Sequence, residues 1–430
     1  MSEAPNFQLS GEAAKRLLDV ARTLAAQTEL RPCLASIIDA GREVLHADRG
    51  TVFLYDPGPR ELFALVATGE NEIRFSIDRG IAGECARTRK LINVKDCYKD
   101  DRFNKEVDRK TGYHTRCLIT VPLIGLEDKL VGVMQLLNPL DKAKVFTEQD
   151  EGIATSLASQ AAVAIQRSRL IDDRIEKLKL EADLDLARQI QQNILPKTLP
   201  DCPGYDLAHF NEPADQTGGD IYDVVALPNG QETSDHAQAV LLFLADATGH
   251  GIGPALSVTQ ARAMLRIGLR FSRNLDELLL CVNAQLTQDL AMNRFITAFM
   301  GILDPVKHEV AYHAPGQGPL LHFRAADGSC RFLSATTVPL GILDDPPLEP
   351  TDPIRMEPGD ILGLLTDGFY EYQNGAEQLF GQERVEQVVA AHRDAGSAQI
   401  IEALLKAVRE FAGGAPQLDD LTALVVKRLA

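Results

Sequence analysis

The feature that most limits how this chain can fold is a long stretch without helix-breaking residues. No glycine or proline occurs between Ile153 and Leu195, and Pro196 follows directly. Glycine and proline disfavour helix interiors, so the stretch predicts one continuous helix over about 149–196, ended by Pro196. Such a helix would be about 70 Å long, which exceeds the face of one small domain. We therefore expect 430 residues to form two domains joined by this linker helix.

The linker helix carries two apolar seams that are rotated relative to each other. A seam that recurs every three to four residues is typical of a coiled coil, and a shift of seam indicates a local change of winding. The pattern favours a parallel homodimer through this helix over the alternative, a single amphipathic helix that packs on its own domain. The first seam contains Ile171, Ile175, Leu178 and Ala182, and the second contains Leu180, Leu184, Ala187 and Ile194.

Composition excludes several classes of protein. The formal net charge is -17, which disfavours nucleic acid and anionic membranes as partners. No apolar run is long enough to cross a bilayer, and the first residues lack the pattern of a signal peptide, so we expect a cytoplasmic protein. The scattered cysteines never have CxxC spacing, which favours reduced, buried thiols over disulfides or zinc ligands. They are Cys33, Cys85, Cys97, Cys117, Cys202, Cys281 and Cys330.

The first zone, residues 1–168, combines helical and strand patterns. Apolar residues keep a helical period from Ala14 to Leu24, through Leu17, Leu18, Val20 and Ala21. Strand-like runs follow at 50–55, 62–66, 118–123 and 130–137, separated by turn residues. This mixture predicts an antiparallel sheet flanked by helices.

The last zone, residues 197–430, is also of mixed type. Apolar strand candidates lie at 239–245, 295–303, 361–365 and 421–426. Helical segments occur in blocks at 253–272 and 275–291, and again at 382–392 and 397–412. Helices in blocks between strands favour an α+β sandwich over a doubly wound parallel sheet.

Acidic residues stand at the ends of these strands. Asp220 opens one strand, Asp246 and Asp367 each close one, and Asp419-Asp420 directly precede another. If the strands pair, the carboxylates repel each other unless cations bind or their pKa values rise. An all-oxygen ligand set selects Mg²⁺ or Mn²⁺ over zinc. Two such ions can share an activated water and hold a phosphoryl group, so the pattern predicts a phosphate-ester hydrolase.

Each of these motifs has a simpler interpretation when it stands alone. Gly-Gly-Asp and Thr-Asp-Gly are common turn sequences, and Asp419-Asp420 could begin a solvated hairpin. His250 could be a turn histidine with no part in catalysis. Their order and spacing together favour function.

That order resembles the SpoIIE-type phosphatases, a bacterial branch of the PPM (type 2C) serine/threonine phosphatases. Asp246-Ala247-Thr248-Gly249-His250-Gly251 is similar to the family's Asp-x-Ser-Gly-His-Gly signature, with Thr248 in place of serine. The resemblance spans about 187–427 and implies an α-β-β-α sandwich. It is also carried by the runs 187–196, 218–223, 314–319, 339–341, 366–368 and 419–422.

The resemblance implies a role for each acid. Asp246 would bridge two ions, while Asp220 and the carbonyl of Ala247 would bind one of them. Asp367 and Asp419 would bind the other, and whether Asp419 or Asp420 is the ligand stays open. Catalysis would then rest on Asp246, Asp220 and Asp367. The implied substrate is a small phosphorylated regulator, such as an anti-sigma-factor antagonist.

Two features depart from the family pattern. Pro315 and Gln317 alter a motif that we expect to form a substrate-facing loop and not the metal core. No arginine matches the phosphate-binding arginine of eukaryotic relatives, so the metal ions would have to bind the phosphate.

The first zone resembles GAF domains, especially those that bind cyclic nucleotides. The runs 73–83 and 100–115 carry the resemblance, which covers about 25–168. It implies a regulatory sensor in which Asp108, Thr111 and Thr115 line a pocket for a cyclic nucleotide. The alternative is that these residues cap helices and turns in a domain that only dimerises.

That GAF family also carries an Asn-Lys…Phe…Asp signature. Asn138, Phe146 and Asp150 are present, but Pro139 replaces the lysine. The ion pair to Asp150 is then lost unless Lys142 or Lys144 supplies it.

Two other functions remain alternatives. Gly-Gly-Asp also occurs in diguanylate cyclases, but a cyclase leaves Asp367 and Asp419 unexplained. The second alternative is a non-enzymatic scaffold with a phosphatase fold, which the complete set of carboxylates disfavours.

Overall fold

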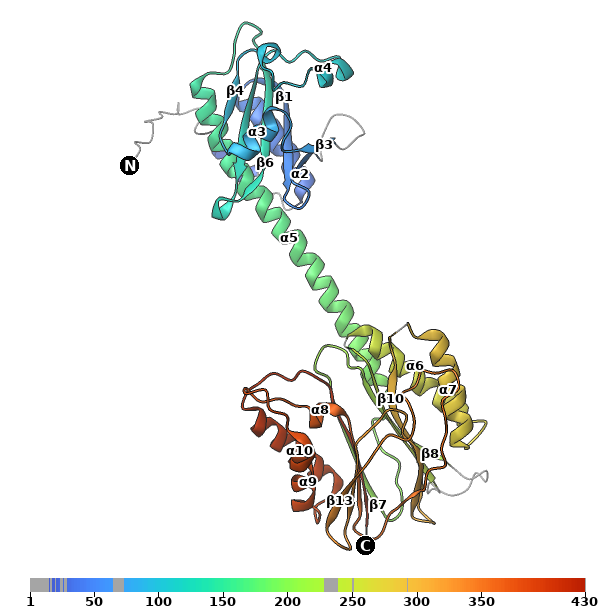
Figure 1. Ribbon diagram of the computed structural model, residues 1–430. Coiled ribbons are helices and arrows are strands. Elements are labelled where there is room, and N and C mark those ends of the chain that lie inside the picture. Colours follow the sequence, from blue (N-terminus) through green and yellow to red (C-terminus); the bar gives the residue numbers. More distant parts are fainter. Residues whose placement is uncertain are drawn as a thin grey trace. The chain divides into compact units, whose positions relative to one another are not determined.

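The computed structural model describes residues 29–64, 73–227, 239–249, 251–291 and 293–429, with isolated positions between 15 and 26. Most of the predicted N-terminal helix, including Ala14, Leu17, Val20 and Leu24, lies outside the described residues, as does His250. The chain divides into two compact units, residues 1–179 and 180–430, which are described separately below (Figure 1).

The first unit is built on an antiparallel sheet. Within the described residues the strand order is β3-β2-β1-β6-β5-β4. The two apolar runs around residues 52 and 134 form the central strands β1 and β6, in which Val52 is the cross-strand partner of Met134. The strands are β1 (Ala47–Asp56), β2 (Glu61–Ala64), β3 (Ile73–Ser76), β4 (Ile92–Val94), β5 (Leu118–Ile124) and β6 (Leu130–Pro139).

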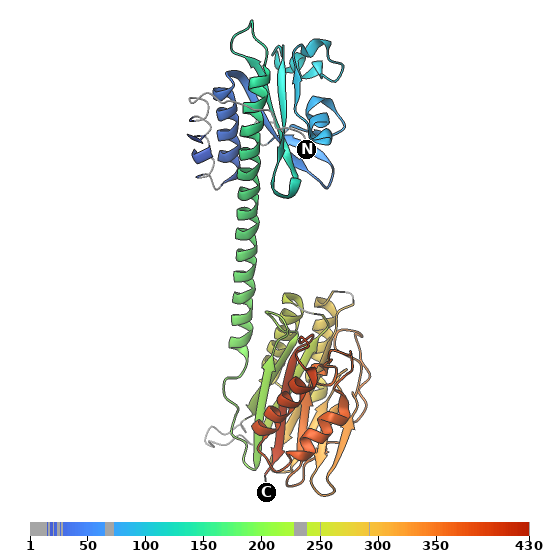
Figure 2. The same ribbon diagram turned by 90° about the vertical axis from the view of Figure 1, so that its left-hand side faces the viewer.

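Helices cover both faces of this sheet (Figure 2). Side chains of β6 alternate between the faces, so Met134 packs with Leu34 of α2 (Leu30–Val44) and Leu157 of α5, whereas Val133 packs with Cys85 of α3. The remaining helical segments are α3 (Gly80–Thr88), η1 (Cys97–Lys99), α4 (Lys105–Thr111) and η2 (Leu126–Asp128).

Helix α5 (Glu148–Ile194) coincides with the helix predicted from the sequence. Its first turns pack on the sheet of the first unit through Leu157 and Ala161. Further along, apolar side chains of the predicted seams are exposed, among them Ile175 and Leu178. None of the helices within the described ranges is long and apolar enough to cross a membrane.

The second unit contains two antiparallel sheets. Among the described residues their orders are β14-β11-β10-β9-β8 and β13-β12-β15-β16-β7. The strands are β7 (Tyr205–Glu212), β8 (Asp220–Leu227), β9 (Ala239–Ala247), β10 (Ile296–Asp304), β11 (Glu309–His313), β12 (Leu320–Arg324), β13 (Ser329–Leu333), β14 (Ile354–Arg355), β15 (Ile361–Leu365) and β16 (Leu421–Arg428).

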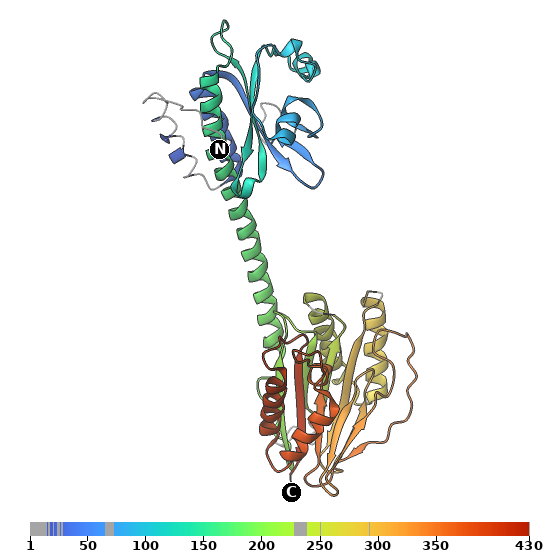
Figure 3. The same ribbon diagram turned by 60° about the vertical axis from the view of Figure 1, so that its left-hand side comes forward.

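The two sheets pack face to face and helices cover both outer faces (Figure 3). The layer between the sheets includes Leu242, Phe299 and Leu424. Helices α6 (Ile252–Gly268) and α7 (Leu275–Asp289) cover the first sheet, whereas α8 (Asp367–Tyr370), α9 (Gly381–Ala391) and α10 (Ser397–Ala412) cover the second. The α+β class and the α-β-β-α sandwich predicted from the sequence are confirmed.

Candidate metal-binding and catalytic site

Strand pairing brings the first two predicted acids together. Asp220, the first residue of β8, is the direct cross-strand partner of Asp246 near the end of β9. A side chain at Gly219 would put its Cβ 2.9 Å from the Ala247 carbonyl oxygen and 3.3 Å from an Asp246 carboxylate oxygen. The Gly-Gly-Asp motif therefore allows a close approach of backbone to carboxylates, which is more than a turn requires.

Residues from the second sheet close the site. The Thr366 hydroxyl donates a hydrogen bond of 2.9 Å to the Asp220 carboxylate. The backbone N–H groups of Asp220 and Ala214 donate to the two carboxylate oxygens of Asp420, at 3.2 and 2.7 Å. Residues two hundred positions apart in sequence are therefore in direct contact.

Asp367 and Asp419 complete the group. Asp367 begins α8, directly after β15, and Asp419 lies just before β16. These two strands are paired, and the Thr366 N–H donates to the Thr422 carbonyl at 3.0 Å, so both acids lie at the same sheet end. A Cβ on Gly368 would overlap the Asp420 carbonyl oxygen, which explains the glycine of Thr-Asp-Gly.

The electrostatics follow from burial and mutual repulsion. Burial, followed by the nearby charges of Asp367 and Asp419, raises the pKa of Asp246 to about 7. Burial and Asp419 raise the pKa of Asp367 to about 6. Burial and Asp246 raise the pKa of Asp220 well above its ordinary value. Converging carboxylates with raised pKa values form a site that a bound cation would stabilise.

The donor set fits hard divalent cations. Its atoms are carboxylate and carbonyl oxygens, as Mg²⁺ and Mn²⁺ prefer. Within the described residues, no three His, Cys, Asp or Glu side chains are arranged closely enough to hold one metal ion among them. Mg²⁺ commonly binds through one or two carboxylates, retains several waters and leaves room for phosphate oxygens. An open arrangement of this kind is compatible with that chemistry.

The two neighbouring acids Asp419 and Asp420 have different surroundings. Asp420 is buried, and both of its carboxylate oxygens accept backbone N–H groups. Asp419 is exposed, and its charge raises the pKa of both Asp246 and Asp367. Asp420 therefore anchors the loop before β8, whereas the exposed Asp419 carboxylate accepts the neighbouring Asp420 N–H through one oxygen, at 2.8 Å.

Sequence analysis missed three residues that support the site. Thr366 is buried and bonds Asp220. Gln191 of α5 is buried and bonds the backbone of Gly218. Gln317, expected in a substrate-facing loop, is instead buried between the two sheets. Both Gln191 and Thr366 lie inside the motif runs 187–196 and 366–368. Thr366 directly precedes Asp-Gly, which was a signal, whereas Gln191 is 27 residues before Gly218 and has no such neighbour in sequence.

A buried ion-pair cluster lies behind the site. Along β8, Tyr222 and Val224 face the layer between the sheets, so Asp223 faces the helices. Two arginines one turn apart on α6 contact the Asp223 carboxylate. Arg262 Nε lies 2.9 Å from it and forms an ion pair without hydrogen-bond geometry. Arg266 donates hydrogen bonds to it. The cluster fixes α6, which begins after the Asp246 loop, against the strand that carries Asp220.

In the first unit, two of the predicted ligand residues contact each other. The buried Asp108 carboxylate accepts hydrogen bonds from the Thr115 N–H at 2.7 Å and the Thr115 hydroxyl at 2.8 Å. It also accepts one from the Tyr98 hydroxyl at 3.2 Å. Thr111 ends α4, but its side chain lies outside the described part of the chain.

Asp150, which would pair with the missing lysine, has a hydrogen-bond partner of another kind. Asp150 accepts from the N–H and hydroxyl of Thr147, so it caps α5. Lys144 pairs with Asp141, so neither expected lysine is seen to replace the ion pair to Asp150 in the described residues. Arg116 instead donates to the carbonyls of Pro139 and Lys142 and holds this loop.

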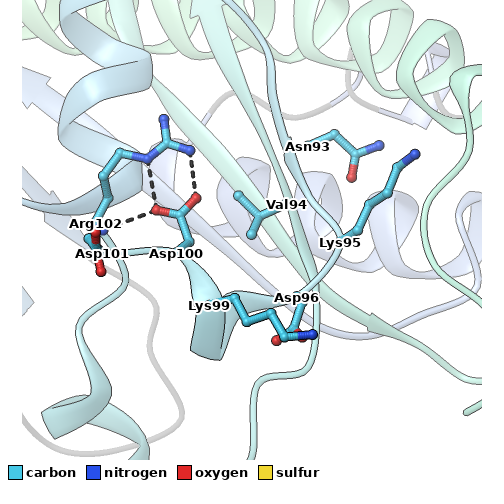
Figure 4. Close-up of a pocket in the computed structure, with 8 residues that line it drawn as sticks. All are labelled: Asn93, Val94, Lys95, Asp96, Lys99, Asp100, Asp101 and Arg102. Atoms are coloured by element: carbon cyan, nitrogen blue, oxygen red, sulfur yellow. Dashed lines mark hydrogen bonds and ion pairs between the residues drawn. The ribbon is translucent and has the colours of Figure 1, made fainter.

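An open cavity of about 530 Å³ lies beside strand β4, and neither Asp108 nor Thr115 is among its lining residues. Figure 4 shows the Arg102 guanidinium facing the Asp100 carboxylate across its rim. Three basic and three acidic residues line it, so its charges balance and select no anion. The lining residues are Asn93, Val94, Lys95, Asp96, Lys99, Asp100, Asp101 and Arg102.

Comparison with protein families assigns both units. Residues 29–165 match the GAF domain, and residues 236–429 match the family described as Stage II sporulation protein E (SpoIIE). The chain joins a GAF domain to a SpoIIE-type phosphatase domain. The order of the two domains is the one that the sequence resemblances indicated.

Solved structures similar to the SpoIIE-type domain include the SiaA-PP2C domain of Pseudomonas aeruginosa. It is 25% identical, with a TM-score of 0.49 over 59% of this chain and 98% of that chain. The RsbU and RsbW domains of a Mycobacterium tuberculosis protein are 26% identical, with a TM-score of 0.45 over 54% of this chain and 62% of that chain.

Curated relatives include cyclic nucleotide phosphodiesterases. A probable 3',5'-cyclic phosphodiesterase of Caenorhabditis elegans is 31% identical over 171 residues, which are 36% of this chain and 23% of that protein. The cGMP-specific 3',5'-cyclic phosphodiesterase of Drosophila melanogaster is 31% identical over 182 residues, 38% of this chain and 16% of that protein. The chain thus spans less than a quarter of these relatives.

Proposed function

We propose that the SpoIIE-type domain is a Mn²⁺- or Mg²⁺-dependent protein serine/threonine phosphatase, and that the GAF domain regulates it. One observation carries the proposal. Asp220, Asp246, Asp367 and the 419–420 pair, which are far apart in sequence, lie at one end of the two-sheet sandwich and repel each other.

The residues have separable roles in this proposal. Asp246 would help to hold both ions, Asp220 and the Ala247 carbonyl would help to hold one, and Asp367 and Asp419 would help to hold the other. When bound, the ions would supply an activated water and neutralise charge on the phosphoryl group. Asp420 holds the loop that leads into β8, as its bonds to backbone N–H groups indicate.

Metal-dependent hydrolysis tests this proposal directly. The full chain should hydrolyse p-nitrophenyl phosphate and a phosphoserine peptide with Mn²⁺ and lose this activity with EDTA. Asp246→Asn should reduce turnover about 10³-fold, since it removes the shared ligand. Asp327→Asn, an exposed aspartate in the β12–β13 hairpin, is the matched control. Equal turnover in Asp246→Asn and the unaltered chain would reject the assignment.

The position of Asp367 and Asp419 beside Asp246 favours a hydrolase over a nucleotide cyclase. Incubation with GTP separates the two, because a cyclase forms a cyclic dinucleotide and a phosphatase does not. A chain that binds Mn²⁺ but neither hydrolyses the phosphopeptide nor forms the cyclic product would be a non-catalytic scaffold.

The proposed substrate is a phosphorylated bacterial regulator such as an anti-sigma-factor antagonist. The resemblance to SpoIIE-type phosphatases supports this class. Because Asp246→Asn should bind a phosphoprotein without turning it over, it can serve as a trap in a pull-down. The trapped protein should be dephosphorylated by the unaltered chain and by Asp327→Asn, and not by the trap variant.

A cyclic purine nucleotide is the proposed ligand of the GAF domain. The similarity to cyclic nucleotide phosphodiesterases supports it. Calorimetric titration of the full chain with cGMP and cAMP should give saturable binding by one of them. Binding of neither would leave dimerisation as the role of this domain.

The linker helix is proposed to join two copies of the chain. Three apolar side chains of the seams, Ile175, Leu178 and Leu180, are 46–59% exposed. Exposed apolar side chains in such a seam favour a second helix as partner. Analytical ultracentrifugation should give a dimer, and Ile175→Glu combined with Leu178→Glu should give monomers. A monomeric unaltered chain contradicts the proposal.

A further inference from the structure

Gln317 joins the two sheets of the phosphatase domain. It lies between β11 and β12, and only 4% of its surface is exposed. Its side-chain Oε1 accepts a hydrogen bond of 3.1 Å from the Thr297 hydroxyl on β10. Its Nε2 donates one of 3.1 Å to the Leu365 carbonyl at the end of β15. One amide group thus contacts both sheets.

Both contacts lead directly to the acids of the site. Thr297 is the cross-strand partner of Asp246. Leu365 is followed by Thr366, which bonds Asp220, and then by Asp367. The amide of Gln317 therefore links the strand segment that holds Asp246 to the segment that holds Asp367.

The backbone around Gln317 is held on the same two sides. The Ala298 N–H on β10 donates to the Pro315 carbonyl at 2.9 Å. The Tyr370 hydroxyl of α8 donates to the Pro319 carbonyl at 3.2 Å. The loop is thus tied to β10 before Gln317 and to the helix of Asp367 after it, which leaves little freedom for the amide to shift.

We propose that Gln317 is a positioning residue that sets the separation between Asp246 and Asp367 and thereby the affinity of the site for divalent cations. The inference rests on the proposed function, in which these carboxylates bind the ions. Groups that orient metal ligands from behind commonly change metal affinity 10- to 100-fold when they are replaced. A burial of this degree excludes contact of Gln317 with a protein substrate.

Calorimetric titration of the full chain with Mn²⁺ tests this, because it measures metal binding without turnover. Gln317→Leu removes both hydrogen bonds at nearly constant volume. Thr297→Val removes one of them, together with the 3.5 Å contact of the Thr297 hydroxyl with the Asp246 carbonyl oxygen. Ser397→Ala is the matched control. Ser397 is fully buried, and its hydroxyl donates to the Asp206 carbonyl. Asp206 is the cross-strand partner of Lys427, at the end of β16 that is remote from Asp420.

We expect Gln317→Leu to bind Mn²⁺ about ten-fold or more weakly than the unaltered chain and Thr297→Val to lie between them. The loss of affinity in the double variant should be less than the sum of the two single losses, because Gln317 and Thr297 share one hydrogen bond. The Mn²⁺ concentration for half-maximal hydrolysis should rise in parallel, while kcat at saturating Mn²⁺ should stay within about three-fold. Ser397→Ala should bind Mn²⁺ normally even where it lowers thermal stability.

The outcomes of these experiments distinguish a failure of the inference from a failure of the proposed phosphatase function. An unaltered chain that binds no Mn²⁺ would overturn the proposed function. Mn²⁺ binding that is strong in the unaltered chain and unchanged in Gln317→Leu and Thr297→Val would overturn the inference alone. An equal loss of affinity in Ser397→Ala would also overturn it, because the effect would then reflect general destabilisation. If Gln317→Leu fails to fold, unchanged Mn²⁺ binding in Thr297→Val still overturns the inference.

Discussion

Gln191 and Gly218 exchange two hydrogen bonds. The Gln191 side-chain N–H donates to the Gly218 carbonyl at 2.7 Å, and the Gly218 N–H donates back to the Gln191 side-chain oxygen at 3.2 Å. Gly218 is two residues before Asp220, and a Cβ on it would lie 2.7 Å from an Asp420 carboxylate oxygen. The last turns of α5 are thus attached to the segment that enters the carboxylate site.

Removing this attachment should weaken the site. In Gln191→Ala both backbone groups of Gly218 lose their partner, and an unpaired buried polar group costs about 1–3 kcal/mol. We expect about ten-fold weaker activation by Mn²⁺, measured as hydrolysis against Mn²⁺ concentration. Gln192→Ala, an exposed neighbour, should behave as the unaltered chain. Equal behaviour of both variants would show that the attachment has no influence.

Asp419 and Asp420 should respond differently to the same substitution. Asp419→Asn removes a charge from an exposed position beside Asp246, so hydrolysis should fall steeply while the melting temperature changes little. Asp420→Asn replaces an acceptor of a backbone N–H, so the fold should lose about 1–3 kcal/mol. Turnover and thermal melting of the two variants check this. Full activity in Asp419→Asn would show that Asp420, and not Asp419, is the metal ligand.

The metal-free protein should become less stable as pH rises. The pKa of Asp246 is raised to about 7 and that of Asp367 to about 6. In the unfolded state an aspartate has a pKa of about 3.9. The folded state therefore binds more protons than the unfolded state between these values, so the free energy of unfolding falls through this window.

We expect a loss of about 1–3 kcal/mol between pH 5 and pH 8 in EDTA, seen as a lower melting temperature. Mn²⁺ at pH 8 should restore it, and Asp246→Asn should flatten the pH dependence. A metal-free chain that melts higher at pH 8 than at pH 5 contradicts the raised pKa values.

Breaking the Asp223 cluster should destabilise the phosphatase domain. Asp223 and Arg262 are both buried, so Asp223→Ala leaves a buried guanidinium without its counter-charge. Such a change costs about 3–5 kcal/mol. Chemical denaturation followed by circular dichroism should detect it. Glu410→Ala, which removes an exposed pair with Lys406, should be nearly neutral.

Local patterns predicted the elements and the acids well, because helix breakers, apolar runs and strand ends are local properties. Helix α5 and the strands around Asp246 and Asp367 follow from them. Strands β7 and β11 to β14 were not predicted, because each is short or alternates polar and apolar residues and so has no long apolar run. It was the register between strands that placed Asp220 opposite Asp246.

The supporting residues were harder to predict, because their roles depend on contacts between distant segments. Gln317 meets Thr297 and Leu365 only after both sheets have formed. Asp223 has no neighbour in sequence that reveals its partners on α6. The different roles of Asp419 and Asp420 also follow from where each side chain points and not from their shared motif.

Strand β16 lies inside its sheet, between β15 and β7, although it follows them both in the chain. It also brings Asp419 and Asp420 to the acids contributed by residues 220–367. A growing polypeptide that has emerged only as far as residue 400 holds three of the acids, two of them paired across β8 and β9, but lacks the strand that brings Asp419 and Asp420 to them. Competence for catalysis would then arise late during synthesis, in one step, when this segment inserts.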